Sequence, residues 1–365
     1  MRTSLRKVFF IAILATMLAP SLHAADKRLL AYYEFSDQWN TPPYTAANIP
    51  YNELTHIIHS NIAPGAKADG SLWIPDGFLE PALLKNAHAA GVKVLVCVSG
   101  DPQLFVAIVG DSNARATFAA NLQKFVQSVG YDGVDFDWEV PNNKAQAENF
   151  VLLLQQLRRL LPSPKYQISA AVSSTPFSWG VYDFPGMTPV LDFYNVMTYD
   201  FHGPWTNHSG HNSPLYLSPE DPGQEGSVKS SIDDFLTEFK VPAEKLNLGA
   251  AFYGYIFNVA NLWDFCVCTG DATSVTFAQV QPLVNNGTWT RNFDALAQAP
   301  YLVHDSRAAF ITYDDEASTA RKTTYVIKDR DLGGIFMWEL SQDYNGTSQN
   351  LMTAMYKAFA RASGQ

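Results

Sequence analysis

Three acidic residues occupy alternate positions in a short apolar stretch of the sequence. Asp135, Asp137 and Glu139 are separated by Phe136 and Trp138. Residues two apart in a β-strand point to the same side, so the three carboxylates would share one face at intervals of about 7 Å. Crowded carboxylates share protons and raise one another's pKa, as a general acid near neutral pH requires. The spacing therefore indicates acid–base chemistry carried by one strand.

Two other interpretations of this acidic row are weaker. A solvated acidic edge strand would be polar on both faces, whereas the alternate face of residues 133–140 is apolar. A divalent-metal site would require His, Asn or further acids at the spacing of a calcium loop, which the neighbouring sequence lacks. We favour a functional site, because groups with perturbed pKa values concentrate there.

Eight short runs of β-branched and apolar residues alternate with amphipathic helical patterns. This alternation is typical of βαβ units around a parallel sheet, and eight units close a (β/α)₈ barrel. The expected strands span residues 29–33, 55–62, 92–98, 133–139, 167–172, 193–198, 246–251 and 334–338. The apolar face of the fourth strand must then meet the helices, so the acids point inward and towards the C-terminal mouth of the barrel.

Helix signals and one long connection complete the predicted fold. Asp111 or Ser112 predicts the start of a helix that ends at Gly130. The connection between strands seven and eight, residues 255–311, is too long to lack order of its own. The predicted fold class is α/β: a (β/α)₈ TIM barrel with a small α+β insertion domain between strands 7 and 8.

The N-terminus and the charge limit where the protein acts and what it binds. Residues 1–24 predict a secretory signal peptide, with Arg2, Arg6 and Lys7 before the apolar run 8–18. We therefore expect a secreted or periplasmic protein. The formal charge of −10 disfavours nucleic acid and anionic membranes as partners.

The cysteines and histidines do not predict a metal site. Cys97 lies in an apolar run and is expected to be a buried free thiol, whereas Cys266 and Cys268 could form a bridge or stay as two thiols. No Cys/His spacing resembles a zinc site. We interpret the cluster His202, His208 and His211 as polar loop residues, and expect neither metal nor cofactor.

The stretch DGVDFDWE, which holds the acidic row, resembles the active-site signature of glycoside hydrolase family 18, the chitinases. Other stretches agree in order along the chain: AYYEF, LTHIIHSNIA, MTYDFHGPW, NSPLY, AFYGY, TYDDEAS and GGIFMWEL. The resemblance covers nearly all of residues 26–365, which we expect to form the catalytic domain.

The resemblance implies hydrolysis of β-1,4-N-acetylglucosaminide bonds in chitin or chito-oligosaccharides, with retention and with the sugar's own acetamido group as nucleophile. Glu139 would protonate the leaving oxygen and then activate water. Asp137 would orient the acetamido group, Asp135 would share a proton with Asp137, and Tyr199 would donate a hydrogen bond to the acetamido oxygen.

Other residues are expected to bind the sugars. Trp338 resembles the ring that forms the floor of the subsite of the cleaved sugar; on position alone, Trp338 could instead fill the barrel and Tyr199 could be an ordinary core tyrosine. The remaining candidates are Met197, Asp200, Tyr32, Trp205, Tyr253 and Glu339.

The chain departs from the family pattern at three places. Cys97 replaces a serine that often supports the deep aspartate, Asp101 replaces a tryptophan, and Tyr255 replaces an arginine. Asp101 predicts weaker binding on the leaving side, or a preference for shorter or partly deacetylated chains.

Two related functions remain as alternatives. Chitinase-like lectins lose the acid, whereas Glu139 is present here. An endo-β-N-acetylglucosaminidase of N-glycans shares the acidic strand, but the insertion, Trp138 and Trp338 favour a deep chitin cleft. We expect a monomer that binds chitin or N-acetylglucosamine oligosaccharides.

Overall fold

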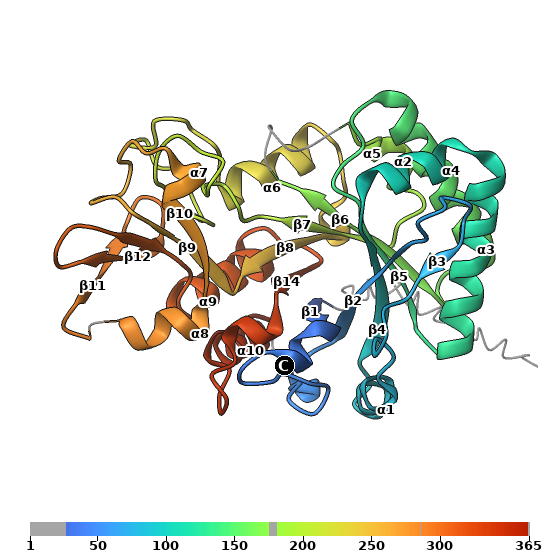
Figure 1. Ribbon diagram of the computed structural model, residues 1–365, viewed down its shortest axis with the longest axis horizontal. Coiled ribbons are helices and arrows are strands. Elements are labelled where there is room, and N and C mark those ends of the chain that lie inside the picture. Colours follow the sequence, from blue (N-terminus) through green and yellow to red (C-terminus); the bar gives the residue numbers. More distant parts are fainter. Residues whose placement is uncertain (1–26, 175–180, 285, 364–365) are drawn as a thin grey trace, which may run out of the picture.

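Eight parallel strands form a closed barrel in the computed structural model, which describes residues 27–174, 181–284 and 286–363 (Figure 1). The strands are β1 (Arg28–Glu34), β2 (His56–Pro64), β4 (Lys93–Ser99), β5 (Gly133–Asp137), β6 (Gln167–Ser173), β7 (Phe193–Met197), β8 (Leu246–Ala251) and β14 (Gly334–Trp338). Neighbours follow the order β1-β14-β8-β7-β6-β5-β4-β2, and β1 also pairs with β2, which closes the barrel. The predicted (β/α)₈ barrel is confirmed. The expected signal peptide lies outside the described residues.

Helices surround the barrel and connect its strands. They are α1 (Pro81–Ala89), α2 (Pro102–Gly110), α3 (Ser112–Val129), α4 (Lys144–Leu160), α5 (Phe184–Met187), α6 (Val228–Thr237), α9 (Glu316–Thr324) and α10 (Asn350–Ser363). Shorter helical segments are η1 (Phe35–Trp39), η2 (Tyr51–Glu53), η3 (Ala243–Lys245), η5 (Tyr325–Asp329) and η6 (Leu340–Asp343). The short strand β3 (Leu72–Trp73) pairs with the end of β2. As predicted, α3 begins after Asp111, whose side chain caps it, and ends at Gly130 with φ 97°.

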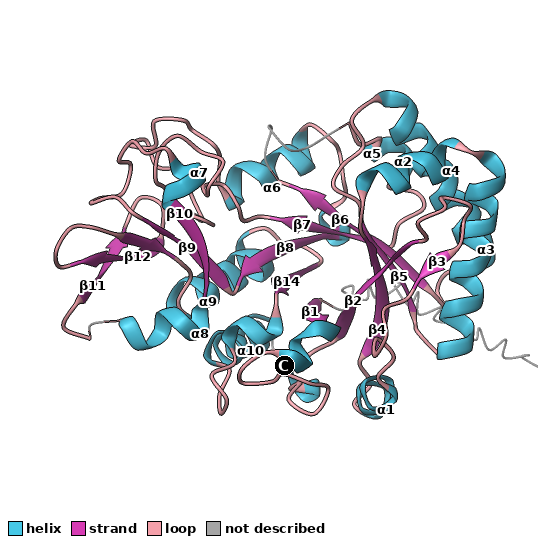
Figure 2. Ribbon diagram, viewed as in Figure 1, coloured by secondary structure: helices cyan, strands magenta, loops and turns pink. Residues whose placement is uncertain are grey.

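An insertion with its own sheet follows β8 (Figure 2). It contains β9 (Tyr253–Phe257), α7 (Cys268–Asp271), β10 (Ala272–Thr276), α8 (Phe277–Val280), η4 (Gln281–Leu283), β11 (Trp289–Asp294), β12 (Ala299–His304) and β13 (Phe310–Thr312). The five strands are antiparallel in the order β10-β9-β13-β12-β11. Because β9 starts two residues after the carboxyl end of β8, this α+β unit stands at the C-terminal rim of the barrel.

As predicted, the apolar side chains of β5 face the helices and the acidic side chains face the inside of the barrel. Trp138 is 1% exposed and packs against Phe105 of α2 and Phe150 of α4, with ring centroids 5.5 and 5.4 Å away. Trp138 therefore belongs to the layer between barrel and helices, so its expected contribution to a sugar cleft is wrong. The strand ends at Asp137, two residues earlier than predicted, and Glu139 lies beyond it.

Among the helices that the structure describes, none is both long and apolar enough to cross a lipid bilayer.

Candidate active site

The acidic row of β5 opens into a cavity of about 800 Å³ at the C-terminal end of the barrel strands. Most of the predicted site residues line this cavity: Asp137, Glu139, Met197, Tyr199, Asp200, Tyr32, Trp205, Tyr253 and Trp338. Their strands lie far apart in the sequence, and barrel closure brings the strand ends together. Asp135 lies deeper, with no exposed surface.

Asp135 is held by hydrogen bonds from three strands. Its carboxylate accepts from the hydroxyls of Tyr32 at 2.9 Å and Ser169 at 2.5 Å, and from the amide of Asn195 at 3.2 Å. Burial raises the pKa of Asp135 to about 6, although these hydrogen bonds and one from the thiol of Cys97 act in the opposite direction. Asp135 is thus fixed in place and close to changing its charge near neutral pH.

Asp137 has one carboxylate oxygen without a protein partner. Oδ2 accepts a hydrogen bond of 3.3 Å from Ser99, whereas Oδ1 is buried and accepts none from the described residues. Burial, followed by the negative charge of Asp135, raises the pKa of Asp137 to about 7. An unpartnered buried acceptor is costly, so Oδ1 is suited to accept a hydrogen bond from a bound group.

Glu139 stands where the cavity admits solvent. Although its side chain is exposed by surface area, the surrounding protein removes it from bulk water and raises its pKa to about 7. The negative charges of Asp137 and Asp200 act in the same direction. A carboxyl group that keeps its proton near neutral pH can act as a general acid.

Asp200 joins the end of β7 to the insertion. Its Oδ1 accepts hydrogen bonds from the hydroxyls of Tyr253 at 2.5 Å and Tyr255 at 2.8 Å. Burial raises the pKa of Asp200 despite these contacts. Tyr255, which stands where the family pattern led us to expect arginine, supplies a neutral donor instead of a cation.

Aromatic rings form the other walls. Trp338 at the end of β14 lies 5.3 Å from the ring of Tyr32, and Tyr199 packs edge-on against Tyr253 at 5.9 Å. Trp205 is 57% exposed and meets Tyr255 edge-on at 5.6 Å. Flat rings beside carboxylates suit sugars, which have apolar faces and polar edges.

The sequence model described as "Glycosyl hydrolases family 18" matches residues 28–343. The chain belongs to this family. Family 18 relatives include "Chitinase A1" of Niallia circulans, 32% identical over 72% of this chain and 42% of that protein. "Endochitinase 1" of Metarhizium robertsii is 28% identical over 86% of this chain and 81% of its own length. This chain therefore spans less than half of the first relative and most of the second.

Solved structures agree on the fold. A Group IV chitinase of Ostrinia furnacalis in complex with allosamidin superposes with a TM-score of 0.82 at 24% identity, covering 92% of this chain and 100% of that one. Chitinase ChiA74 from Bacillus thuringiensis gives a TM-score of 0.80 at 25% identity, covering 92% and 70%. The family 18 resemblance read from the sequence is confirmed.

Glu339 is not brought to the family 18 cavity. It is 2% exposed, and its carboxylate accepts hydrogen bonds from the backbone N–H of Ser341 at 2.8 Å and from the Ser341 hydroxyl at 2.5 Å. Glu339 thus caps η6, and the expectation that it contacts sugar does not fit its position. The alternation that places Trp338 on one side of β14 turns the next side chain away.

Asp101 also has a structural role, in addition to the one predicted from its place in the family pattern. It is the N-cap of α2, and its carboxylate accepts a 2.8 Å hydrogen bond from the N–H of Gln103. The side chain remains exposed and carries its charge outside the cavity lining.

A buried polar layer beneath the acids was missed. Asn195 also donates to the hydroxyl of Tyr32 at 3.0 Å, and the amide of Asn247 donates to Asn195 at 2.9 Å. Asn195 and Asn247 are single polar positions inside otherwise apolar strands, whereas Ser169 shares its strand with Gln167 and Ser173. The two asparagines could therefore have been identified from the sequence. The loop residues Thr206, Asn207 and Glu225 also line the cavity, without a comparable signal.

Proposed function

We propose that the protein hydrolyses β-1,4-N-acetylglucosaminide bonds in chitin or chito-oligosaccharides with retention of configuration. The supporting observation is the row Asp135, Asp137 and Glu139, which leads from a fully buried position into a cavity of about 800 Å³. One acid of this row keeps its proton near neutral pH, and another has a free acceptor oxygen. Family membership and the chitinases among the relatives support the same reaction.

In the proposed reaction, Glu139 donates its proton to the glycosidic oxygen as the bond from that oxygen to the anomeric carbon breaks. The acetamido oxygen of the same sugar attacks the anomeric carbon, giving a cyclic oxazolinium ion. Asp137 Oδ1 accepts a hydrogen bond from the acetamido N–H and balances the developing positive charge. Glu139, now a carboxylate, removes a proton from the water that opens the ring.

Asp135 supports this sequence from below. Tyr32 and Asn195 hold the carboxylate of Asp135 in place by hydrogen bonds. Asp135 and Asp137 can then share one proton before the reaction, and this proton stays on Asp135 when Asp137 must be negative. Tyr199 is proposed to donate to the acetamido oxygen. Trp338 is proposed as the floor of the sugar subsite, with Met197, Asp200, Tyr32, Trp205 and Tyr253 as further contacts.

The reaction is tested by replacing Glu139 with Gln. The amide keeps the size of the side chain but cannot supply an acidic proton, so turnover of the hexamer of N-acetylglucosamine should fall at least about 100-fold while oligomer binding remains. Glu148→Gln, the same change at an exposed position of α4, is the matched control. Products are identified by mass spectrometry, and their anomeric form by NMR immediately after cleavage.

Different outcomes separate this function from its rivals. Wild-type protein that binds the hexamer without cleaving it would indicate a lectin. Release of an N-glycan from a glycoprotein, with the hexamer left intact, would indicate the N-glycan enzyme. Products that first appear as the α-anomer would contradict retention.

We also propose that the protein acts outside the cytoplasm as a monomer. The signal-like residues 1–24 support export. The N-terminal sequence of the mature protein and its mass by light scattering test both points; an intact leader in the extracellular fraction, or a stable dimer, would contradict them.

A further inference from the structure

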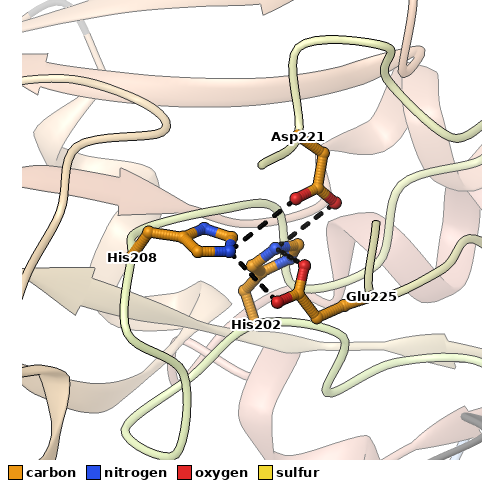
Figure 3. Close-up of side chains that lie close together, drawn as sticks. All are labelled: His202, His208, Asp221 and Glu225. Atoms are coloured by element: carbon orange, nitrogen blue, oxygen red, sulfur yellow. Dashed lines mark hydrogen bonds and ion pairs between the residues drawn. The ribbon is translucent and has the colours of Figure 1, made fainter. Parts of the chain in front are cut away.

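Two histidines and two carboxylates converge beside the active-site cavity. One ligand atom from each of His202, His208, Asp221 and Glu225 lies within 4.8 Å of every other, and the first three side chains are buried (Figure 3). All four come from the irregular segment between β7 and α6. Glu225 also lines the cavity. The cluster therefore borders the proposed substrate site without containing any of the acids proposed for hydrolysis.

The four side chains lie close enough together for one ion to contact all of them. Glu225 places its two oxygens 3.1 Å from His202 Nε2 and 3.0 Å from His208 Nε2. The oxygens of Asp221 lie 3.5 and 3.8 Å from the same two nitrogens. Each carboxylate therefore turns a different oxygen towards each ring. Tetrahedral binding of one ion would use one of these oxygens from each carboxylate together with the two Nε2 atoms.

The hydrogen bond of Nδ1 in each ring determines which way Nε2 points. His202 Nδ1 lies 3.0 Å from the carbonyl oxygen of His211, and His208 Nδ1 lies 3.0 Å from the carbonyl oxygen of Ser209. A carbonyl can only accept, so each Nδ1 carries a proton and donates it. When Nε2 carries no proton, its lone pair points towards the carboxylates. A histidine that donates its Nδ1–H to a carbonyl is oriented to bind a metal ion through Nε2.

Charge balance requires positive charge between these groups. Two neutral imidazoles and two carboxylates would leave two negative charges in a largely buried site, which is costly. Either two extra protons, one on each Nε2, or a single divalent cation would balance them. Two protons would satisfy the contacts with Glu225 at 3.0 and 3.1 Å and leave those with Asp221 at 3.5 and 3.8 Å long, whereas one cation can bind an oxygen of each carboxylate together with both nitrogens.

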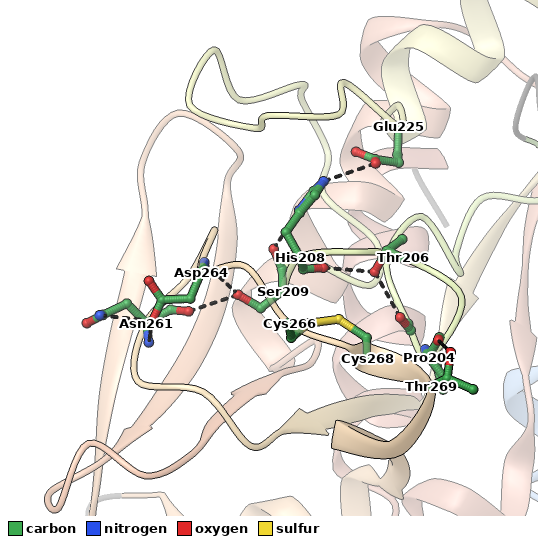
Figure 4. The surroundings of a disulfide bond; sticks show 11 residues. Pro204, Thr206, His208, Ser209, Glu225, Asn261, Asp264, Cys266, Cys268 and Thr269 are labelled. Carbon is green, nitrogen blue, oxygen red and sulfur yellow. Dashed lines mark hydrogen bonds and ion pairs between the residues drawn. A yellow bond between two sulfur atoms is a disulfide. The ribbon is translucent and has the colours of Figure 1, made fainter.

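The surroundings close the cluster from the side of the insertion. The ring of Trp263 lies edge-on to His202 with centroids 5.5 Å apart. Backbone hydrogen bonds join this segment to the histidine loop: Ser209 donates to Asp264 at 2.8 Å, and Cys266 donates to Asn207 at 3.1 Å. Cys266 forms a disulfide bond with Cys268, the first of the two alternatives expected from the sequence (Figure 4). These contacts with the insertion therefore stabilise the conformation of the loop that carries His202 and His208.

We propose that His202, His208, Asp221 and Glu225 bind one divalent transition-metal ion, with Zn²⁺ the ion that suits two imidazoles and two carboxylates in a tetrahedron. Ca²⁺ and Mg²⁺ fit less well because they prefer oxygen ligands alone. The ion fixes the loop whose residues Thr206 and Asn207 form one wall of the cavity. From the sequence we interpreted these histidines as polar loop residues, because the two carboxylates follow them at no recognisable spacing.

The proposal is tested on untagged full-length protein. After incubation with Zn²⁺ and extensive dialysis, elemental analysis should find about one zinc per wild-type chain. His208→Gln, which removes one ligand, should weaken Zn²⁺ binding in calorimetry at least about 10-fold. His88→Gln is the matched control, since His88 is an exposed histidine paired with Asp132 outside the cluster. A chelator should lower the melting temperature of wild type and the control, and Zn²⁺ should restore it.

A second measurement covers the case in which His208→Gln fails to fold. Co²⁺ added to metal-free wild-type protein should give the visible absorption bands of tetrahedral coordination, and Asp221→Asn should reduce them. Wild-type protein that retains no zinc and gives no such bands would overturn the proposal. Equal zinc content and affinity in wild type and His208→Gln would do the same. None of these readouts depends on hydrolysis, so the proposed function stands or falls separately.

Discussion

Among single residues, Asp200 affects the proposed acid because its negative charge helps to raise the pKa of Glu139. That charge, after burial and Asp137, holds the pKa of Glu139 at about 7. The proposed first step needs protonated Glu139, so kcat should decline as pH rises through 7. Asp200→Asn removes one negative neighbour while its side-chain oxygen can still accept from Tyr253 and Tyr255. The alkaline limb of the pH profile should therefore move to lower pH.

The profile is measured with a fluorogenic chitobioside under saturating conditions. Asp233→Asn, which removes an acid on α6 outside the cavity lining, provides the control and should leave the alkaline limb where it is. An unchanged limb in Asp200→Asn would mean that another group limits the rate at high pH.

Asp137 should make the protein less stable as its carboxyl ionises. Its pKa is raised from 3.8 to about 7 in the folded protein, so the folded state binds more protons than the unfolded state between these values. Stability contributed by the protonated form is therefore present at low pH and is lost as pH rises from about 4 to 7. Asp137→Asn removes this loss. Its free energy of unfolding should match that of wild type near pH 4 and exceed it at pH 8 by up to about 4 kcal/mol.

Chemical denaturation at the two pH values measures this difference. The same variant should lose hydrolysis, because a neutral amide cannot balance the developing oxazolinium charge. A variant that is less stable than wild type at pH 8 would show that Asp137 is held by favourable contacts and not under electrostatic strain.

Among the helices, α2 is capped by Asp101, and two substitutions of this residue can distinguish its capping role from the effect of its charge. Asp101→Ala removes the cap of α2 and should lower the free energy of unfolding by about 1 kcal/mol, whereas Asp101→Asn can still cap the helix. If the exposed charge favours partly deacetylated, cationic chains, both variants should lose that preference relative to fully acetylated oligomers. Denaturation curves and paired kinetics give the two answers. Retention of the preference in Asp101→Asn would dismiss the charge effect.

The elements that the sequence could predict are those specified by local signals. Strands such as β5 follow from strict alternation, and α3 follows from a capping aspartate and a terminal glycine, because these signals are local. The direction of Glu339 could also have been predicted, because alternation turns the residue after Trp338 to the opposite side of β14. The buried Asn195 and Asn247 could have been found as single polar positions in apolar strands. The grouping of Glu225 with the histidines could not, because an irregular loop has no period.

At the scale of the whole molecule, the cavity lies between the barrel and its insertion. Trp205, from the barrel, rests edge-on against Tyr255, from the insertion, and leaves 57% of its surface exposed. Such a ring is suited to hold a sugar unit away from the reacting bond. Trp205→Ala should therefore raise KM for long chito-oligosaccharides about 5-fold, the effect of an aromatic contact worth about 1 kcal/mol. The value of kcat should change less, because Glu139 and Asp137 keep their places.

Trp39 provides the matched control for this prediction. It is 65% exposed, as open as Trp205, but does not line the cavity. Trp39→Ala should leave KM for soluble oligomers unchanged. Because the substrate is proposed to be uncharged and the protein carries −10, the effect of Trp205→Ala should also be the same at low and high salt. Equal losses in both tryptophan variants would mean that exposed rings in general bind chitin, and that the junction of barrel and insertion has no special part in holding the chain.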